Sequence, residues 1–268
     1  MRRQVMAKRA APKKPRKTAK TTRRRKPSKT QGLLGRFLAW FVGWTFIKAG
    51  FFWAIRGVVV LAILAALLVA VFSVVAPPTT PYILSEARRL SGVQRTWVAI
   101  EDVSPALPKS IVAAEDANFC LHWGFDMAAI RAAIDDGAVR GASTLSQQTV
   151  KNVFLWQGRS WPRKALEAVL TPVVEAIWSK ERIIEVYMNV AEFDEGVFGA
   201  EAAAMAYFGK GAGRLTDREA ALLAAVLPDP KGRSARQPSD FVNRRARSIA
   251  DGAATIAADG RAACFQPD

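Results

Sequence analysis

The stretch AEDANFCLHWGFD, residues 114–126, places two carboxylates beside the only histidine of the chain. A metal site would need several histidine, cysteine or carboxylate side chains to converge, and one histidine beside an acid is weak evidence for zinc. A nucleophilic triad is no better supported, because Cys120 lies two residues from His122 and a helix would point the two side chains apart. The remaining interpretation is acid–base chemistry on a carboxylate.

Glu115 is the carboxylate that the helical spacing singles out. Ile111, Glu115 and Phe119 recur every four residues and would share one helix face, so Glu115 would lie among apolar neighbours. A carboxylate in such surroundings is suited to proton transfer, whereas an ordinary surface position is the alternative. We expect His122 to be structural and to cap the end of this helix through its ring.

A second group of polar residues lies in GASTLSQQTVKN, residues 141–152. Thr144 and Gln147 have the spacing of a capping box, which predicts the start of a helix. The polar side chains would form two adjacent rows on it, Ser143, Gln147 and Lys151 beside Thr144, Gln148 and Asn152. Such rows fit either a solvated helix face or a face that binds a polar ligand.

The third group lies in GRSWPRKALE, residues 158–167. Arg159, Arg163 and Glu167 follow one another at steps of four, and Lys164 lies beside them. On a solvated surface these residues would form a salt-bridge ladder worth about a few tenths of a kcal/mol. In a site they would form a cation cluster able to bind a diphosphate, with a carboxylate to orient a cation or a metal ion.

Charge is distributed unevenly along the 268 residues. Residues 1–36 hold 15 Lys and Arg and no acid, whereas residues 86–268 hold 22 Lys and Arg against 23 Asp and Glu, a net of −1. The formal charge of +16 is therefore mainly a property of the N-terminal tail, which has few large apolar residues and is expected to be disordered. The chain as a whole is 50% hydrophobic and can bury a substantial core outside the tail.

Residues 57–76, GVVVLAILAALLVAVFSVVA, are uncharged and long enough to cross a bilayer as one helix. Their length and flanks favour an uncleaved anchor over a signal peptide. Residues 37–56 are rich in Trp and Phe and are expected to form an interfacial segment, a second span being the alternative. The positive-inside rule places the tail in the cytoplasm near anionic lipid, and the chain beyond the span outside it.

The sequence after the span predicts helices and no convincing strand, so the expected fold class is mainly α. Helical periodicity occurs in residues 104–122, 127–139, 143–156, 160–189, 196–209 and 216–227. In the fourth of these segments, capped by Ser160 and kinked at Pro172, the expected buried side is Leu166, Leu170, Val173, Ile177, Ile184 and Tyr187. Cys120 and Cys264 could pair in an oxidising compartment, but nothing in their spacing argues for it, so we expect two free thiols.

Four ordered motifs resemble the glycosyltransferase family 51 domains that polymerise peptidoglycan. They are EDANFCLHWGFD, GASTLSQQTVKN, RSWPRKALE and WSKERIIEVYMNVAEFDEGVFGAEAAAMAYFGK. The resemblance covers residues 85–250 and implies a lysozyme-like helical domain behind one N-terminal transmembrane helix. Residues 251–268 would be a C-terminal extension, too short for a penicillin-binding domain, as in monofunctional members of the family.

The resemblance also implies roles for residues that match the family's motifs. Glu115 would be the general base that deprotonates the 4-hydroxyl of the acceptor sugar, and Glu167 would orient the diphosphate of the donor. Asp116 would support the helix geometry. The cations that would stabilise the diphosphate leaving group are Lys151 and Arg159, with Arg163 and Lys164 as lesser candidates. The residues expected to bind sugar and diphosphate oxygens are Ser143, Gln147, Gln148 and Asn152.

The implied substrates are lipid II and a lipid-linked glycan chain, joined by a β-1,4 bond with inversion. The implied location is the bacterial inner membrane, with a single span, a cytoplasmic N-terminus and a periplasmic catalytic domain. Cell-wall synthesis proteins are candidate partners, and nucleic acid is not expected. No cofactor is certain, and a divalent cation, Mg²⁺ or Mn²⁺, is left open.

Two other functions compete with this expectation. A lytic transglycosylase or muramidase of similar fold needs a catalytic acid for a poor sugar leaving group, and a cluster of lysine and arginine does not serve that reaction. A membrane-tethered binding protein could use its basic tail on nucleic acid, but that function leaves the four ordered motifs unexplained.

Overall fold

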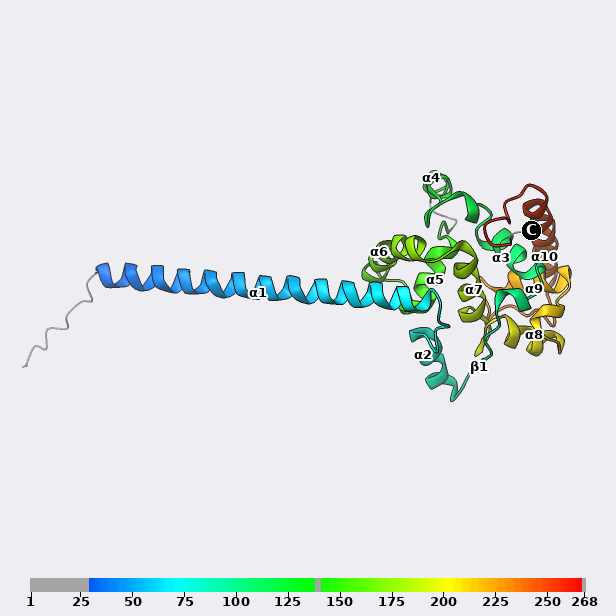
Figure 1. Cartoon of the computed structure of the whole chain (residues 1–268), viewed down its shortest axis with the longest axis horizontal. Coiled ribbons are helices and arrows are strands. Elements are labelled where there is room, and N and C mark those ends of the chain that lie inside the picture. Colours follow the sequence, from blue (N-terminus) through cyan, green and yellow to red (C-terminus); the bar gives the residue numbers. More distant parts are fainter. Residues whose placement is uncertain (1–28, 138–140, 267–268) are drawn as a thin grey trace, which may run out of the picture. The chain divides into compact units, whose positions relative to one another are not determined.

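The computed structural model describes residues 29–137 and 141–266 (Figure 1). The chain comprises two units, Met1–Val60 and Leu61–Asp268. Most of the tail that we expect to be disordered, residues 1–28, lies outside the described residues. Its last residues, from Lys29, belong to a helix.

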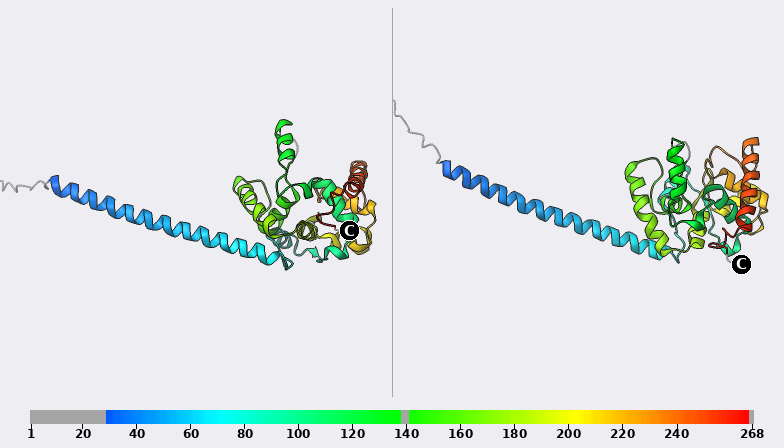
Figure 2. Two further views of the ribbon diagram at one scale, coloured as in Figure 1. Left: turned by 45° about the horizontal axis from the view of Figure 1, so that its top comes forward. Right: turned by 90° about the horizontal axis from the view of Figure 1, so that it is seen from above.

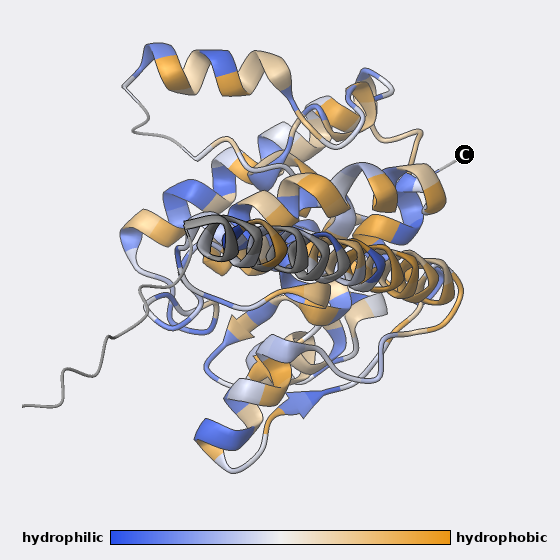
Figure 3. Cartoon of the chain, turned by 90° about the vertical axis from the view of Figure 1, so that its left-hand side faces the viewer, coloured by the Kyte–Doolittle hydropathy of each residue, from blue (hydrophilic) through white to orange (hydrophobic). Residues whose placement is uncertain are grey.

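Helix α1 runs without interruption from Lys29 to Phe72 (Figure 2). The aromatic segment 37–56 and most of the predicted span share this helix, because no proline interrupts it. Among the described residues, its one stretch apolar enough to cross a bilayer is Gly50–Phe72, with a mean hydropathy of 2.8. In Figure 3 this stretch is largely orange, the colour of hydrophobic residues. It begins and ends earlier than the predicted span.

The end of α1 lies four residues before the predicted Ala76, and bonds from other elements explain why. Trp178 donates from Nε1 to the carbonyl of Val69 at 2.8 Å. Arg182 donates to the carbonyls of Phe72, at 3.0 and 3.1 Å, and Val75, at 2.8 Å. The Arg182 bonds satisfy the carbonyl of Phe72, the last residue of α1, and the carbonyl of Val75 just beyond it, so the chain can leave the helix before its prolines.

The second unit is mainly α-helical, as predicted. Its helices are α2 (Pro81–Leu90), α3 (Ala106–Glu115), α4 (Met127–Asp135), α5 (Leu145–Phe154), α6 (Trp161–Ile177), α7 (Lys180–Val190), α8 (Ala200–Phe208), α9 (Asp217–Val226) and α10 (Asp240–Ala258). Its 3₁₀ turns are η1 (Ile100–Asp102), η2 (Phe119–Leu121) and η3 (Ala212–Arg214). One small sheet has the order β1-β3-β2, with β1 (Gln94–Arg95) parallel and β2 (Glu192–Asp194) antiparallel to β3 (Val197–Phe198). Strands this short show no alternating pattern in the sequence.

The segment predicted as one helix over residues 160–189 forms two. Ser160 caps α6 as expected, accepting from the amide of Arg163. The helix continues through Pro172 but ends at Ile177, because Trp178 is buried and adopts an extended backbone. Ser179 then caps α7. A serine cap within an apolar segment is thus the signal that the prediction missed.

Helix α6 buries a different face from the predicted one. Its buried side chains are mostly polar, Arg163, Glu167, Thr171, Val174 and Glu175. Of the six residues expected in the core, Leu166 and Ile177 are exposed, Leu170 and Val173 are half-buried against the core, and Ile184 and Tyr187 of α7 are buried as predicted. Trp161 and Val169 of α6 are exposed by 88% and 66%. Helical periodicity identifies an apolar side but does not say whether that side meets protein or another apolar phase.

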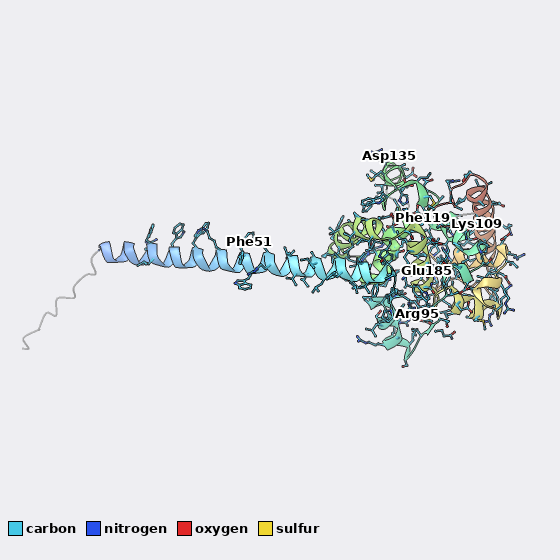
Figure 4. All side chains as sticks on the ribbon, in the orientation of Figure 1. Phe51, Arg95, Lys109, Phe119, Asp135 and Glu185 are labelled. Atoms are coloured by element: carbon cyan, nitrogen blue, oxygen red, sulfur yellow. A yellow bond between two sulfur atoms is a disulfide. The ribbon has the colours of Figure 1, made fainter. Side chains whose placement is uncertain are left out.

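Two groups of helices hold the motifs in place. Helices α3, α9 and α10 pack on one another, and α5 packs against both α6 and α7. Leu107 and Ile111 of α3, Leu223 of α9 and Phe119 of η2 are fully buried. Phe119 is labelled in Figure 4. Each of the four side chains contributes about 2 kcal/mol by leaving water, so the end of α3 is fixed by apolar packing.

Cys120 of η2 and Cys264 form a disulfide, so the expectation of free thiols is wrong. The chain turns back after α10 and brings two cysteines 144 positions apart to one place. Phe265 is buried beside Phe119, and Arg261 donates to the carbonyl of Ala117 at 3.1 Å. Helix α10 also runs through residue 250, so no structural boundary separates the predicted extension from the preceding domain.

Candidate active site

Asp116 connects the end of α3 to the start of α5. It is buried, and its Oδ2 accepts from the amide of Leu145 at 2.9 Å. We expected His122 to cap a helix end, but it does not. Its Nε2 lies 2.9 and 3.1 Å from the two carboxylate oxygens of Asp116. A carboxylate is a stronger acceptor than a helix carbonyl, which explains the difference. Both residues therefore frame the site.

Glu115, the last residue of α3, has a side chain only 13% exposed. Its Oε2 accepts from Nε2 of Gln148 on α5 at 3.0 Å. Its Oε1 is buried and has no hydrogen-bond partner among the described residues, and the nearest cation, Arg245 Nη2, lies 3.9 Å away. Ile111 lies on the same helix and is buried as predicted, whereas Phe119 reaches the core from η2.

The predicted polar helix starts where expected. The Thr144 side chain accepts from the amide of Gln147, whose Oε1 accepts from the Thr144 amide at 3.1 Å. The side chain of Gln147 is therefore used, through this capping box, to stabilise the start of the helix. Asn152 accepts from Nε2 of Gln157 at 3.2 Å. Ser143 precedes the helix, and its Oγ accepts from Nζ of Lys164 at 3.1 Å.

Glu167 is the centre of an ion cluster on α6. Its side chain is 3% exposed, its Oε2 lies 2.7 Å from Nη1 of Arg163, and its Oε1 binds Nζ of Lys164. Arg163 also donates from Nε to the carbonyl of Gly158 at 2.8 Å. Of the predicted group, Arg163 and Lys164 pair with Glu167 and Arg159 does not; Glu167 and Arg163 are buried, whereas Lys164 remains partly exposed.

A pocket of about 350 Å³ opens between α5 and α6. Its lining residues are Ser143, Gln147, Gln148, Lys151, Gln157, Gly158, Arg159, Arg163, Lys164 and Glu167. Four positive side chains against one carboxylate give this lining a formal net charge of +3. Lys151 and Arg159 form no ion pair with any described residue. The pocket is thus suited to an anion such as a diphosphate.

Burial lowers the pKa of Lys151, while the carboxylate of Glu167 acts in the opposite direction. A lysine that is kept partly dehydrated forms a stronger bond with an incoming anion than a hydrated one. Lys151 is therefore well placed to bind a negatively charged ligand.

The predicted site residues do not all meet in this pocket. Glu115 lies beside it, connected through Gln148, and Asn152 points to Gln157 and does not line it. Gln157 and Gly158 line it without having been predicted. Gln157 precedes the third polar group and Gly158 is its first residue, and neither residue type gives a signal of its own in the sequence.

The donor set does not fit a resident metal ion. Both oxygens of Glu167 are engaged by Arg163 and Lys164. No group of three histidine, cysteine or acidic side chains with the geometry of a metal site occurs among the described residues. A divalent cation needs several oxygen ligands, and the one carboxylate of this pocket is already engaged by two cations.

Comparison with known proteins identifies the family of the chain. The sequence model described as transglycosylase matches residues 83–254. A biosynthetic peptidoglycan transglycosylase of Jannaschia sp. (strain CCS1) is 62% identical over 213 residues, covering 80% of this chain and 89% of its own. Proteins of the same name from Rhodospirillum centenum and Caulobacter vibrioides are 48% and 44% identical, covering 78% and 73% of this chain and 94% and 87% of their own. The chain, with its motif carboxylates and cationic pocket, belongs to the transglycosylase family.

Proposed function

We propose that the chain polymerises lipid II into β-1,4-linked glycan strands, inverting the anomeric carbon and releasing undecaprenyl diphosphate. As a member of its family it is a peptidoglycan glycosyltransferase of cell-wall synthesis with a lysozyme-like helical domain. The single observation that carries the finer proposal is the cationic pocket beside Glu115. A carboxylate next to an anion site suits a reaction in which one substrate is deprotonated and the other loses a diphosphate.

The donor's diphosphate binds in the cationic pocket. Lys151 and Arg159 supply charge to the leaving group, because neither is committed to an ion pair with a described residue. Arg163 and Lys164 contribute less, since both already neutralise Glu167. Glu167 thereby acts by orienting these cations. The uncharged lining residues available to sugar and phosphate oxygens are Ser143, Gln147, Gln148 and Gln157.

Glu115 accepts the proton of the acceptor's 4-hydroxyl. As that oxygen bonds to the donor's anomeric carbon, the bond from this carbon to the diphosphate oxygen breaks, and its electron pair leaves with undecaprenyl diphosphate. The carboxylate of Glu115 is held in place for this step by the bond from Nε2 of Gln148 to its Oε2. An oriented carboxylate near the reacting hydroxyl contributes about 10²- to 10⁴-fold to such a step.

We place the domain outside the cytoplasm, behind one span within Gly50–Phe72. The disulfide between Cys120 and Cys264 supports an oxidising compartment, the periplasm. The charge of residues 1–36 supports a cytoplasmic N-terminus that contacts anionic lipid. The rings of Trp44 and Phe52 lie under Lys48 and Arg56, an arrangement suited to the headgroup region.

Contact with the leaflet is assigned to the exposed apolar side of α6. Residues 153–156 are also apolar, but Val153 and Leu155 are buried in the core. Trp161 and Val169 of α6 are exposed by 88% and 66%. Glu167 belongs to the buried side of the same helix. An apolar outer face and a polar inner face suit a helix between lipid and a polar pocket.

Purified protein in detergent, given fluorescently labelled lipid II, tests the proposal. We expect polymer that a muramidase digests to disaccharide units. Absence of polymer would contradict the proposal. Cleavage of preformed glycan without polymerisation would instead favour the lytic enzyme, which the net positive pocket makes the weaker candidate.

A further inference from the structure

The chain reverses after α10 and folds back onto residues 116–122, the η2 loop, which directly follows Glu115. Gly260 adopts a φ of +79°, in the left-handed region that favours glycine, and so allows the reversal. The returning C-terminal segment, residues 259–266, lies beyond residues 83–254, the part of the chain that matches the transglycosylase model. The C-terminal segment therefore adds contacts to the matched domain from outside it.

Three contacts attach the C-terminal segment to the η2 loop, and each joins one residue of the segment to one residue of the loop. They are a hydrogen bond from Nη1 of Arg261 to the carbonyl of Ala117 at 3.1 Å, the packing of Phe265 on Phe119, and the disulfide between Cys264 and Cys120. The two phenylalanines are fully buried, whereas both cysteines are half-buried. The η2 loop is thus held on one side by apolar packing, a hydrogen bond and a covalent bond.

The η2 loop also carries the frame of the site. Asp116 accepts from the amide of Leu145 and lies 2.9 Å from Nε2 of His122. The amide of Phe119, at the start of η2, donates to the carbonyl of Asp116 at 3.0 Å, so η2 is bonded directly to the residue after Glu115. A displacement of η2 is therefore passed to Asp116 and to the end of α3.

We propose that Cys120, Cys264 and Arg261 are positioning residues for the reaction: through them the C-terminal segment holds the η2 loop, and with it the end of α3, in the position that orients Glu115. The inference rests on the proposed function, in which Glu115 accepts the proton of the acceptor. Glu115 is the last residue of α3, so the backbone where the helix ends sets the direction of its side chain. A misplacement of about 1 Å at a reacting group can slow a reaction about 100-fold.

The cationic pocket does not depend on these contacts. The lining residues that the structure describes for it all lie within 143–167, outside both the η2 loop and the C-terminal segment. Loss of the disulfide should therefore lower kcat while the KM for lipid II changes little. The alternative is a bond that only stabilises the fold, and such a bond would change the melting temperature without changing kcat in protein that is fully folded.

The test measures polymerisation of labelled lipid II by the full-length protein before and after treatment with dithiothreitol, at a temperature well below the melting temperature of the reduced protein. Reduction converts the disulfide to two thiols, and dithiothreitol is oxidised to its cyclic disulfide. The chain has two cysteines, so the reductant has no other target in it. We expect kcat to fall about tenfold, with KM within about twofold of its starting value, and to recover on reoxidation. The double variant Cys120→Ser, Cys264→Ser should show the low kcat and ignore dithiothreitol.

Phe198→Leu is the matched control for lost stability, because Phe198 is a fully buried residue of β3 in the small sheet. It should lower the melting temperature and keep the wild-type kcat at the assay temperature. An unchanged kcat in the reduced, folded protein would overturn the inference. An equal loss in Phe198→Leu would also overturn it, because the loss would then follow stability and not the η2 loop.

Should reduction unfold the protein, Arg261→Gln decides, since it removes the bond to Ala117 and keeps the disulfide. A lower kcat in folded Arg261→Gln, with KM retained, supports the inference, and a wild-type kcat overturns it. If wild type makes no polymer, the proposed function fails instead, so the two failures are distinguishable.

Discussion

Gln148 on α5 donates a hydrogen bond from Nε2 to Oε2 of Glu115 at the end of α3, over 3.0 Å. The hydroxyl of Tyr187 on α7 donates to the oxygen of the same amide at 3.2 Å, which fixes the orientation of the amide. Gln148 also lines the cationic pocket. One neutral side chain therefore connects the proposed base with the proposed diphosphate site.

Replacing Gln148 by Leu is expected to lower kcat for polymerisation by about 10- to 100-fold, because Glu115 loses the donor that orients it. Tyr187→Phe removes only the bond to the far side of the amide and should cost less than about tenfold. Initial rates with saturating lipid II measure both effects. A Leu variant as active as wild type would show that the Gln148 bond does not orient the base.

Lys151→Met is expected to abolish measurable polymerisation while raising the free energy of unfolding at neutral pH. Burial lowers the pKa of Lys151 in the folded state, so protonated Lys151 opposes folding. This penalty is present below the lowered pKa and disappears as pH rises towards the ordinary lysine value. Chemical denaturation at neutral and alkaline pH should therefore show the Met variant's advantage shrinking with pH, and a constant or growing advantage would be inconsistent with it.

Glu167→Gln is expected to destabilise the domain by about 3 kcal/mol, because Arg163 then stays buried without a compensating charge. Polymerisation should fall by about 100-fold or more as the cations lose their orientation. Glu185→Gln is the matched control, since Glu185 pairs with Arg182 three residues away on α7, outside the pocket. Equal activity losses in the two variants would argue against a role for Glu167 in the site.

Removing the disulfide with Cys264→Ser and Cys120→Ser together is expected to lower the free energy of unfolding by about 3 to 5 kcal/mol, because the bond closes a long loop. The C-terminal segment, including buried Phe265, should then detach from η2. Thermal melting with and without a reductant measures the effect. A reductant should lower the wild-type melting temperature to that of the double variant and leave the variant unchanged; a wild type indifferent to reduction would mean that the bond adds no stability.

Local signals were sufficient for the elements that begin with a serine or threonine cap. Thr144 and Ser160 start α5 and α6 where the sequence predicts, because a cap depends on residues within one helical turn. The predicted members of the pocket lie mostly on or next to these two helices, so their spacing along the sequence was enough to identify them.

Relations between distant segments could not be predicted in this way. The partner of Cys120 is 144 residues away, and Arg245 reaches Glu115 from a helix that carries none of the four motifs. The orientation of α6 depends on the polar pocket that it covers, so its apolar periodicity indicated the wrong buried side. These features arise from the tertiary arrangement, to which a one-dimensional pattern is insensitive.

Polymerisation of labelled lipid II by Glu115→Gln tests the assignment of the base most directly. The substitution keeps the shape of the side chain and removes its ability to accept a proton. We predict a loss of about 10³-fold or more in kcat, with the melting temperature and the binding of the donor's diphosphate retained. Polymerisation by Glu115→Gln at the wild-type rate would contradict the central claim that Glu115 deprotonates the acceptor.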